Sequence, residues 1–346
     1  METKSPEMPA QAQQDLLIAL QRGVALVRHP WSAMAMALGI PEAEVLRATQ
    51  ELFERGVARR FGAVFDSRHL GYGSTLCAVD VPLADLERVA ALLHPHPGIT
   101  HCYEREGRPN LWFTMTAQSD RLEDELRKVG AALNPHQILN LPAVRRFKVE
   151  VVLDAVEDDT AGGVIGEVLP DAGKQALSPC FTDREKALIR KIQGNLPLTG
   201  APFASVAQEL EWDQDDLLRQ LAAWKQAGIL RRIGCILRHR AAGFVSNGMC
   251  VWPVAEADVV RAGRALAANP EVTHCYERPS SPAFPFNLFA MIHAREQGAA
   301  EKTFHRLSER AALSGGRMLI STREFKKSSP VFFCETPVAT GKPGSA

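Results

Sequence analysis

The chain has 346 residues and a mass of 37.9 kDa, which is long enough for two or more domains with cores of their own. Forty basic residues balance forty acidic ones, so the composition excludes a basic nucleic-acid-binding surface over the whole protein. No apolar run approaches the ~18 residues of a membrane helix, no apolar signal core opens the chain, and the seven cysteines form no C-x-x-C pair. We therefore expect a cytoplasmic globular protein without a disulfide framework or a zinc ribbon.

In chain order, the first predicted elements are three short helices. Apolar residues at helical spacing predict helices over residues 15–24 and near 33–35, and a third helix begins at Pro41 and ends at Gly56. Three short helices with a tight turn between the last two are typical of a winged helix-turn-helix. We place this domain at residues 13–72.

A different pattern follows in the next eighty residues. It predicts a strand at 74–81, a helix at 83–93, hairpin strands near 98–104 and 111–116, a helix at 122–133 and a last strand within 138–153. The order βαββαβ is that of the ferredoxin-like fold, an antiparallel sheet with helices on one face. We place this domain at 73–153 and a linker, rich in Asp, Gly, Ala and Pro, at 154–180.

The second half of the chain repeats the first. Arg59-Arg60 recurs as Arg231-Arg232, and the hexapeptide Thr-His-Cys-Tyr-Glu-Arg at 100–105 recurs letter for letter at 273–278. The same patterns predict a winged helix-turn-helix at 181–244 and a ferredoxin-like domain at 245–330. The predicted fold class is therefore α+β, a tandem duplication of one two-domain unit. We expect the halves to pair through their sheets as an intrachain pseudo-dimer, with further homo-oligomers left open.

This domain order resembles that of the Lrp/AsnC regulators, which would imply DNA binding. The third predicted helix of each half opposes that function. Residues 41–56 carry four acidic and two basic side chains, and residues 211–228 carry the same balance. A helix that enters the major groove gains affinity by neutralising phosphates with Lys and Arg. We therefore expect a helix-turn-helix scaffold that binds no DNA.

Four motifs, in one order, resemble those of the siroheme decarboxylases. They are Arg-Arg-Phe/Ile-Gly, Gly-Ile-Thr-His-Cys-Tyr, Asn-Leu-Trp-Phe-Thr and Leu-Pro-Ala-Val-Arg-Arg-Phe-Lys. This family is Lrp/AsnC-like and occurs as two subunits or as one fused chain; here the first half is similar to the D-type subunit and the second to the L-type. The resemblance implies a carboxy-lyase of haem d1 synthesis in denitrifying bacteria, which removes two acetate carboxyl groups of sirohaem as CO2 and gives 12,18-didecarboxysiroheme. It implies no separate cofactor, because the iron belongs to the sirohaem substrate.

The chemistry of this substrate indicates the residue types that would bind it. Sirohaem is a flat macrocycle rimmed by eight carboxylates, and arginine pairs with carboxylates bidentately and stays charged. A single Arg or Tyr is as easily structural, but repetition of the same positions in both halves favours anion binding. The candidates for substrate binding are Arg59, Arg60, Tyr103, Arg105, Arg145, Arg231, Arg232, Arg240, Tyr276 and Arg278.

His101 and His274 are the catalytic candidates. Each is followed two positions later by a Tyr that faces the same side of the predicted strand. Imidazole can donate a proton near neutral pH and is a common axial ligand of haem iron. The resemblance implies essential histidines at these positions; we expect one to deliver a proton, and iron ligation stays open to either. Cys102 and Cys275 alternate to the other face and are expected in the core.

The halves differ at several positions that lie close to these motifs. Asp66 corresponds to Arg238, His69 has no counterpart, and His239 and His293 occur only in the second half. One of the two pockets is therefore expected to be productive, and the sequence leaves open which. Two other functions also stay open: an Lrp/AsnC-type DNA-binding regulator, and a tetrapyrrole-binding protein without catalysis.

Overall fold

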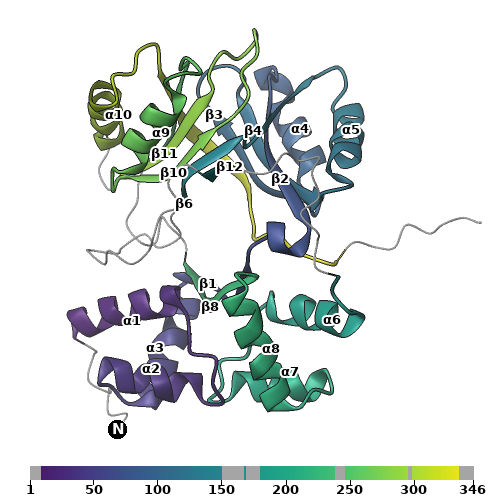
Figure 1. Ribbon diagram of the computed structural model, residues 1–346, viewed down its shortest axis with the longest axis vertical. Coiled ribbons are helices and arrows are strands. Elements are labelled where there is room, and N and C mark those ends of the chain that lie inside the picture. Colours follow the sequence, from purple (N-terminus) through teal and green to yellow (C-terminus); the bar gives the residue numbers. More distant parts are fainter. Residues whose placement is uncertain (1–8, 150–166, 169–179, 238–245, 295–297, 335–346) are drawn as a thin grey trace, which may run out of the picture.

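The computed structural model describes residues 9–149, 167–168, 180–237, 246–294 and 298–334. They form two units, one above the other in Figure 1, and both halves of the chain contribute to each. The lower is a helix-turn-helix unit and the upper is a sheet unit. None of the helices in these ranges is long and apolar enough to cross a membrane.

The helix-turn-helix unit contains six helices from the described residues. They are α1 (Ala10–Arg22), α2 (Pro30–Leu38), α3 (Glu42–Glu54), α6 (Asp183–Ile192), α7 (Pro202–Glu209) and α8 (Gln214–Gln226). Local sequence sets several of their starts: a proline opens α2 and α7, and Thr182 and Glu185 form a capping box on α6. Apolar side chains of both halves, Trp31, Phe203 and Trp224 among them, share one core. The helix-turn-helix domains of the two halves are thus a single packed body.

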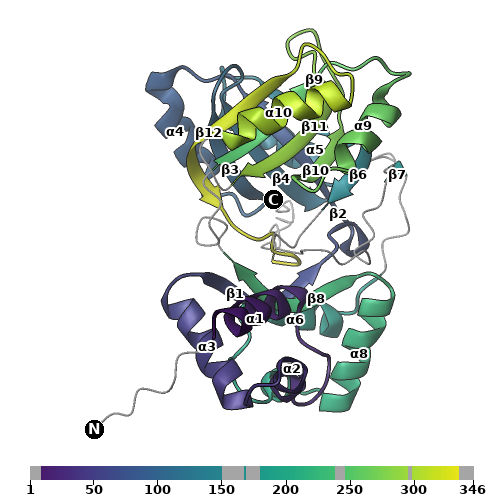
Figure 2. The same ribbon diagram turned by 90° about the vertical axis from the view of Figure 1, so that its left-hand side faces the viewer.

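A two-stranded ribbon lies on the side of this body that faces the sheet unit (Figures 1 and 2). Its strands β1 (Ala58–Phe65) and β8 (Leu230–Leu237) are antiparallel, with Gly62 opposite Gly234. The pairing skips Arg59 in β1 and Arg231 in β8, so each arginine stands at a β-bulge. A bulge bends the strand locally and redirects the side chain it carries.

Each half of the sheet unit has the predicted βαββαβ order, which confirms the ferredoxin-like plan. The first half contributes β2 (Tyr72–Val79), α4 (Leu86–Leu93), β3 (Ile99–Arg105), β4 (Leu111–Gln118), α5 (Leu122–Ala132) and β5 (Ile138–Pro142). The second contributes β9 (Ser246–Trp252), α9 (Val259–Ala267), β10 (Val272–Glu277), β11 (Leu288–Ala294), α10 (Ala299–Arg310) and β12 (Arg317–Lys327). Two short 3₁₀ helices, η1 (Arg68–Leu70) and η2 (Leu83–Asp85), lie on either side of β2.

The last strands of the two halves cross over. Apart from the ribbon strands β1 and β8, the described strands form one sheet in the order β5-β2-β4-β3-β12-β9-β11-β10-β6-β7, where β6 is Arg145–Val149 and β7 is Glu167–Val168. The sequence predicted a last strand within 138–153, and β5 is that strand, but the range also contains β6, which was not predicted: β5 stays with its own half, whereas β6 pairs with β10 of the other. In the second half, the single strand β12 pairs with β9 at its start and with β3 at its end.

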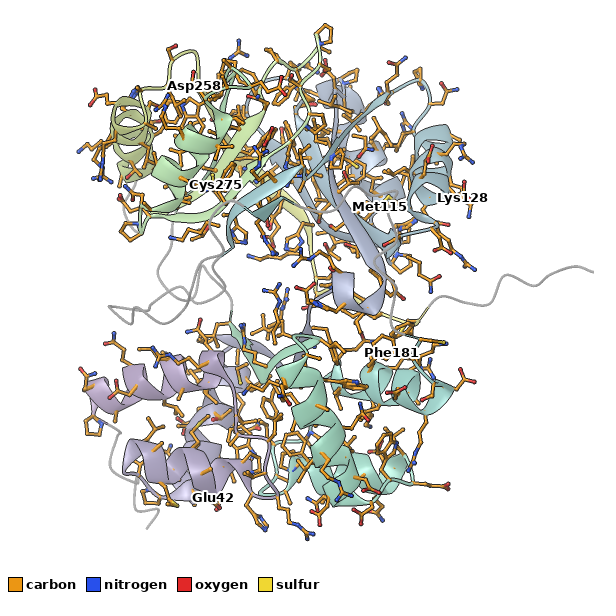
Figure 3. The ribbon with its side chains drawn as sticks, in the orientation of Figure 1. Glu42, Met115, Lys128, Phe181, Asp258 and Cys275 are labelled. Atoms are coloured by element: carbon orange, nitrogen blue, oxygen red, sulfur yellow. The ribbon has the colours of Figure 1, made fainter. Side chains whose placement is uncertain are left out.

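The sheet is curled, and its helices lie on the outside. Helices α4 and α5 cover the outer face of one half and α9 and α10 that of the other (Figures 1 and 2). A separate core lies beneath each pair of helices, and Cys102 and Cys275 are buried in these two cores, as predicted. A further apolar cluster, with Trp112, Phe284 and Phe289, lies on the inner faces. Figure 3 labels Cys275 and Met115, one in each half.

Candidate active site

Two equivalent groups of side chains lie on the inner faces of the sheet. On β3, the rings of His101 and Tyr103 stack with centroids 6.2 Å apart, and on β10 those of His274 and Tyr276 stack at 6.3 Å. Tyr103 lies opposite Trp112, and Tyr276 lies opposite Phe289, which places both tyrosines on the side of the inner apolar cluster. We call these groups the His101 face and the His274 face. The predicted pairing of each histidine with its tyrosine is present in the structure.

A threonine positions each histidine. The strand pairing skips Thr100 in β3 and Thr273 in β10, so each is a bulge residue directly before the histidine. The hydroxyl of Thr100 is hydrogen-bonded to Nδ1 of His101 at 2.9 Å, and that of Thr273 to Nδ1 of His274 at 3.0 Å. A hydrogen bond at one ring nitrogen fixes the orientation of the imidazole and directs its chemistry to the other.

The His101 face keeps its histidine neutral when no substrate is bound. Burial, followed by the positive charges of Lys327 and Arg59, lowers the pKa of His101 to about 4. Burial also raises the pKa of Tyr103, and the nearby carboxylate of Glu324 adds to that rise. At neutral pH, this face therefore presents an uncharged imidazole and an intact phenol.

Arg105 and Arg278 are the most deeply buried arginines of the two faces. Arg105 Nη1 donates to the carbonyl of Leu319 at 3.0 Å, and Arg278 Nη1 donates to that of Leu141 at 2.5 Å, so each reaches a strand of the other half. Their guanidinium carbons lie 5.5 and 5.0 Å from the ring centres of the tyrosines on their own strands. Burial lowers the pKa of both to about 10, so both stay charged at neutral pH. The Nε atom of each is buried and makes no hydrogen bond with the described residues.

The bulged arginines of the ribbon reach the two faces from below. Arg59 donates to the carbonyl of Lys327 at 3.1 Å and to the hydroxyl of Ser329 at 3.0 Å. Arg231 donates to Asp66 at 2.7 Å, and its charge acts on Tyr276 as that of Arg59 acts on Tyr103. Both arginines are therefore part of the faces, as the repeat predicted.

Asp66 accepts from two arginines. Burial opposes its ionisation, but the hydrogen bonds from Arg68 and Arg231 outweigh burial and hold its pKa well below its ordinary value. The carboxylate therefore remains charged and compensates part of the positive charge beside the His274 face. The corresponding residue of the repeat, Arg238, lies outside the described residues, as does the predicted site residue Arg240.

Three predicted arginines are not brought to the faces. Arg60 stays within the ribbon, where its Nη1 donates to the carbonyl of Ala63 at 3.2 Å. Burial lowers the pKa of Arg60 to about 10, and the nearby charges of Arg59 and Arg232 add to this effect. Arg232 is half-buried in the ribbon too, and burial lowers its pKa. Arg145 forms an ion pair with Glu277 at 2.6 Å, and Glu277 alternates with Tyr276 to the outer face.

The structure adds two residues that sequence reasoning missed. Arg146, next to Arg145, lies directly opposite Tyr276 on the neighbouring strand, and its charge acts on the Tyr276 hydroxyl. Glu324 lies at the equivalent place opposite Tyr103. Both stand in the repeated Arg-Arg-Phe-Lys and Arg-Glu-Phe-Lys motifs, but their importance depends on the crossing of the last strands, which the sequence pattern did not show.

In the helices that would read DNA, Arg47 of α3 and Arg219 of α8 form ion pairs with acidic residues of their own helix. In α3, Arg47 pairs with both Glu44 and Glu51. At the start of α8, Asp215 pairs with Arg28 of the other half at 2.7 Å, an ion pair between two exposed side chains. Glu42 lies at the end of the helix-turn-helix unit farthest from the sheet unit (Figure 3). Within the described ranges, no group of three or more His, Cys, Asp or Glu is placed to hold a metal ion.

Comparison with known proteins identifies the family. A model of the siroheme decarboxylase NirDL-like HTH domain matches residues 13–59 and 185–231, and one of the AsnC-like ligand binding domain matches 69–148 and 241–326. A siroheme decarboxylase of Hydrogenobacter thermophilus is 37% identical over 92% of this chain and 94% of its own length. The NirDL subunit of the siroheme decarboxylase of Paracoccus denitrificans is 36% identical over 90% of this chain and 94% of its own. The chain belongs to the siroheme decarboxylase family.

Solved structures of this family have the same architecture. A crystal structure of the siroheme decarboxylase NirDL, 34% identical, superposes with a TM-score of 0.72 over 93% of this chain and 94% of that one. A second, 33% identical with a TM-score of 0.71, is a complex with an iron-uroporphyrin III analogue. The predicted resemblance, the fused two-half organisation and the tandem fold are thus confirmed. The siroheme decarboxylases are carboxy-lyases, so the expectation of an enzyme is confirmed as well.

Proposed function

We propose that this chain binds sirohaem and removes the carboxyl groups of two acetate side chains as CO2, giving 12,18-didecarboxysiroheme. The observation that carries the proposal is the repeated His–Tyr–Arg face, on which a histidine, a tyrosine and a buried arginine lie beside a second arginine from the ribbon. Relatives that match nearly the whole chain are siroheme decarboxylases, and one relative binds an iron-uroporphyrin analogue.

The chemistry needs positioning, charge and one proton for each acetate. Guanidinium groups hold the carboxylates of the rim through charge-assisted hydrogen bonds. The bond between the methylene carbon and the carboxylate carbon breaks, and CO2 leaves. The electron pair delocalises into the macrocycle, and a proton from a histidine then forms the methyl group. The conjugated substrate accepts the electrons, so the protein needs no separate cofactor.

Substrate binding itself prepares the proton donor. In the substrate-free protein, His101 is neutral because burial and two nearby cations lower its pKa to about 4. The carboxylates of sirohaem would compensate the charges of Lys327 and Arg59, which raises the pKa of the imidazole and lets it take up a proton. One of His101 and His274 delivers this proton, and either imidazole can be an axial ligand of the substrate iron. The two halves act together as an intrachain pseudo-dimer, supported by the strands that they exchange.

The test is anaerobic incubation of the purified chain with sirohaem, followed by mass spectrometry of the extracted tetrapyrrole. We expect the mass to fall by two CO2. In His101→Ala or His274→Ala, we expect sirohaem to bind, with its spectral shift, and turnover to fall by about 10²–10⁴-fold, the usual contribution of a general acid. His29→Ala, a change at an exposed histidine of the helix-turn-helix unit, is the matched control.

Other outcomes would contradict the proposal in different ways. Unchanged turnover in both single variants would remove the histidines from the mechanism. A bound, spectrally shifted tetrapyrrole of unchanged mass would indicate a non-catalytic tetrapyrrole-binding protein. Salt-sensitive binding to duplex DNA in a gel shift would favour the regulator, which the ion pairs of α3 and α8 oppose.

A further inference from the structure

Two threonine hydroxyls and the imidazole of His101 form a closed triangle of contacts. The Thr100 hydroxyl lies 2.9 Å from Nδ1 of His101 and 2.8 Å from the hydroxyl of Thr114, which is itself 3.4 Å from Nδ1. Thr114 of β4 lies opposite His101 of β3, so these two side chains share a face of the sheet. Both hydroxyls are on the Nδ1 side of the ring, which leaves Nε2 for the substrate.

The number of hydroxyl hydrogens limits how this triangle can be bonded. Each hydroxyl has one hydrogen to donate. Thr100 is only 4% exposed, and among the described residues its hydroxyl hydrogen has two acceptors, Nδ1 of His101 and the oxygen of Thr114. When the imidazole holds two protons, Nδ1 is itself a donor, and the oxygen of Thr114 is the acceptor that remains. Without it, protonation of His101 would leave a buried hydroxyl hydrogen without an acceptor in the described part of the chain.

The charges around His101 oppose its protonation. Lys327 of β12 and Arg59 of the ribbon face the imidazole, and burial acts in the same direction. Tyr103 on the same strand stays neutral because burial raises its pKa, and β4 contributes the neutral Thr114. A hydrogen bond that accepts from Nδ1–H favours the protonated imidazole. The hydroxyl pair therefore acts in the direction that proton delivery needs.

In the second half, a backbone carbonyl takes the place of the Thr114 hydroxyl. Met291 lies opposite His274. The Thr273 hydroxyl, 3.0 Å from Nδ1 of His274, donates to the carbonyl of Met291 at 3.4 Å. A backbone acceptor does not depend on the side chain, whereas Thr114 supplies its oxygen from a side chain that can be replaced. A substitution at Thr114 therefore changes the hydrogen bonding of His101 and leaves that of His274.

We propose that Thr114 is a positioning residue for the proton that His101 delivers. Its oxygen accepts the hydrogen of Thr100, which turns the Thr100 oxygen toward Nδ1 and lets the imidazole hold a proton on both nitrogens. The Nε2 proton is transferred to the carbon that has lost CO2, where the electron pair of the broken C–C bond forms the new C–H bond, and the imidazole becomes neutral. The inference rests on the proposed function, because the proton serves that reaction.

The test is the anaerobic decarboxylation of sirohaem by the full chain, measured over a range of pH. Thr114→Val removes the hydroxyl and keeps the branched shape. We expect its kcat near neutral pH to fall by about tenfold, the effect of one buried hydroxyl without an acceptor, with KM and the binding of iron-uroporphyrin III unchanged. Because the imidazolium is less stable, the pH above which kcat declines should move down by about one unit. Thr114→Ser keeps the hydroxyl and should restore both.

The matched control is Thr116→Val, the same substitution on β4 at an exposed hydroxyl that bonds Ser74. It should leave kcat and the pH profile unchanged, and circular dichroism checks the fold of every variant. A lower kcat with a shifted profile in Thr114→Val, restored in Thr114→Ser, supports the positioning role.

Other outcomes overturn the inference, and they are distinct from a failure of the proposed function. An unchanged kcat and profile in Thr114→Val overturns it, and so does an equal loss in Thr114→Ser or Thr116→Val, while decarboxylation by the unaltered chain still stands. Loss of iron-uroporphyrin III binding in Thr114→Val would make Thr114 a contact of the ligand instead. If the unaltered chain leaves the mass of sirohaem unchanged, the proposed function fails and this inference fails with it.

Discussion

His101 is held in a state that folding imposes on it. Its pKa of about 4 in the folded chain lies below the usual value for an exposed imidazole, because burial and two cations oppose its protonation. As pH falls below about 6.5, the unfolded chain takes up a proton that the folded chain refuses, so stability is lost between about pH 6.5 and pH 4. Above that window, the contribution is fully present.

The lowered pKa of His101 predicts how the stability of the substrate-free protein changes with pH. Between pH 7 and pH 4.5, the His101→Gln variant is expected to lose about 2–3 kcal/mol less unfolding free energy than the unaltered chain, because it has no group to protonate there. Urea denaturation at the two pH values measures the difference. His29→Gln, at an exposed site, should keep the full pH dependence. Equal losses in all three proteins would show that His101 is accessible to protons in the folded state.

The sequence pointed to Arg145 as a site residue, whereas the structure places its neighbour Arg146 opposite Tyr276 on an inner face of the sheet. The sequence identified a basic pair in the last strand of the first half, and one member of that pair lies on an inner face. Side chains alternate along a strand, so a choice between neighbours is a choice between faces. That choice depends on the partner strand, which here comes from the other half of the chain. The motif was therefore predictable, and the residue within it was not.

The bulges of the strands decide which repeated side chains reach the faces. Arg59 and Arg231 are skipped by the ribbon pairing, as Thr100 and Thr273 are skipped beside β4 and β11. The sequence predicted the βαββαβ order, because periodicity and turn residues are local signals. It did not predict the bulges or the crossing of β6, which depend on pairing between distant segments. Half of the arginine candidates from the ribbon were consequently placed elsewhere.

The β1–β8 ribbon depends on a close backbone approach at Gly62. A Cβ atom there would lie 2.1 Å from the carbonyl oxygen of Gly194 and 2.9 Å from that of Ile192, both backbone atoms with little room to move. We expect Gly62→Ala to destabilise the chain by about 1–3 kcal/mol. Gly130→Ala is the matched control: its Cβ would have Ile138 Cδ1 as its nearest neighbour, at 3.8 Å, and alanine favours the helix by up to about 1 kcal/mol.

Thermal unfolding of the two alanine variants distinguishes crowding from a general effect of the substitution. The melting temperature of Gly62→Ala should fall and that of Gly130→Ala should stay the same or rise. A fall of similar size in both would contradict the close packing of the ribbon against the loop after α6. Because the ribbon carries Arg59 and Arg231, Gly62→Ala should also weaken binding of iron-uroporphyrin III, whereas Gly130→Ala should not.

At the scale of the molecule, the segment after β12 ties the two units together. Phe332 is buried in the core of the helix-turn-helix unit, and its backbone N–H donates to the side chain of Gln193 at 2.8 Å. The N–H of Phe333 donates to the hydroxyl of Tyr72, the first residue of β2, at 2.7 Å. Phe181, which faces this segment, lies at the junction of the units (Figure 3). The sequence placed the end of the last domain at 330, because three residues without periodicity give no signal of docking.

This docking predicts a loss of coupling when Phe332 is removed. The ring packs against Tyr72 with centroids 5.0 Å apart and against Phe65 at 6.4 Å, so Phe332→Ala leaves a cavity that costs about 3–5 kcal/mol. We expect differential scanning calorimetry to show one transition in the unaltered chain and a separate, earlier transition of the helix-turn-helix unit in the variant. Val331→Ala, at a neighbouring side chain that is 44% exposed, should melt as the unaltered chain does. Arg59 reaches the His101 face across the same junction, so a variant that melts in two steps should also lose affinity for the tetrapyrrole. A single, unshifted transition in Phe332→Ala would show instead that the ribbon alone couples the two units.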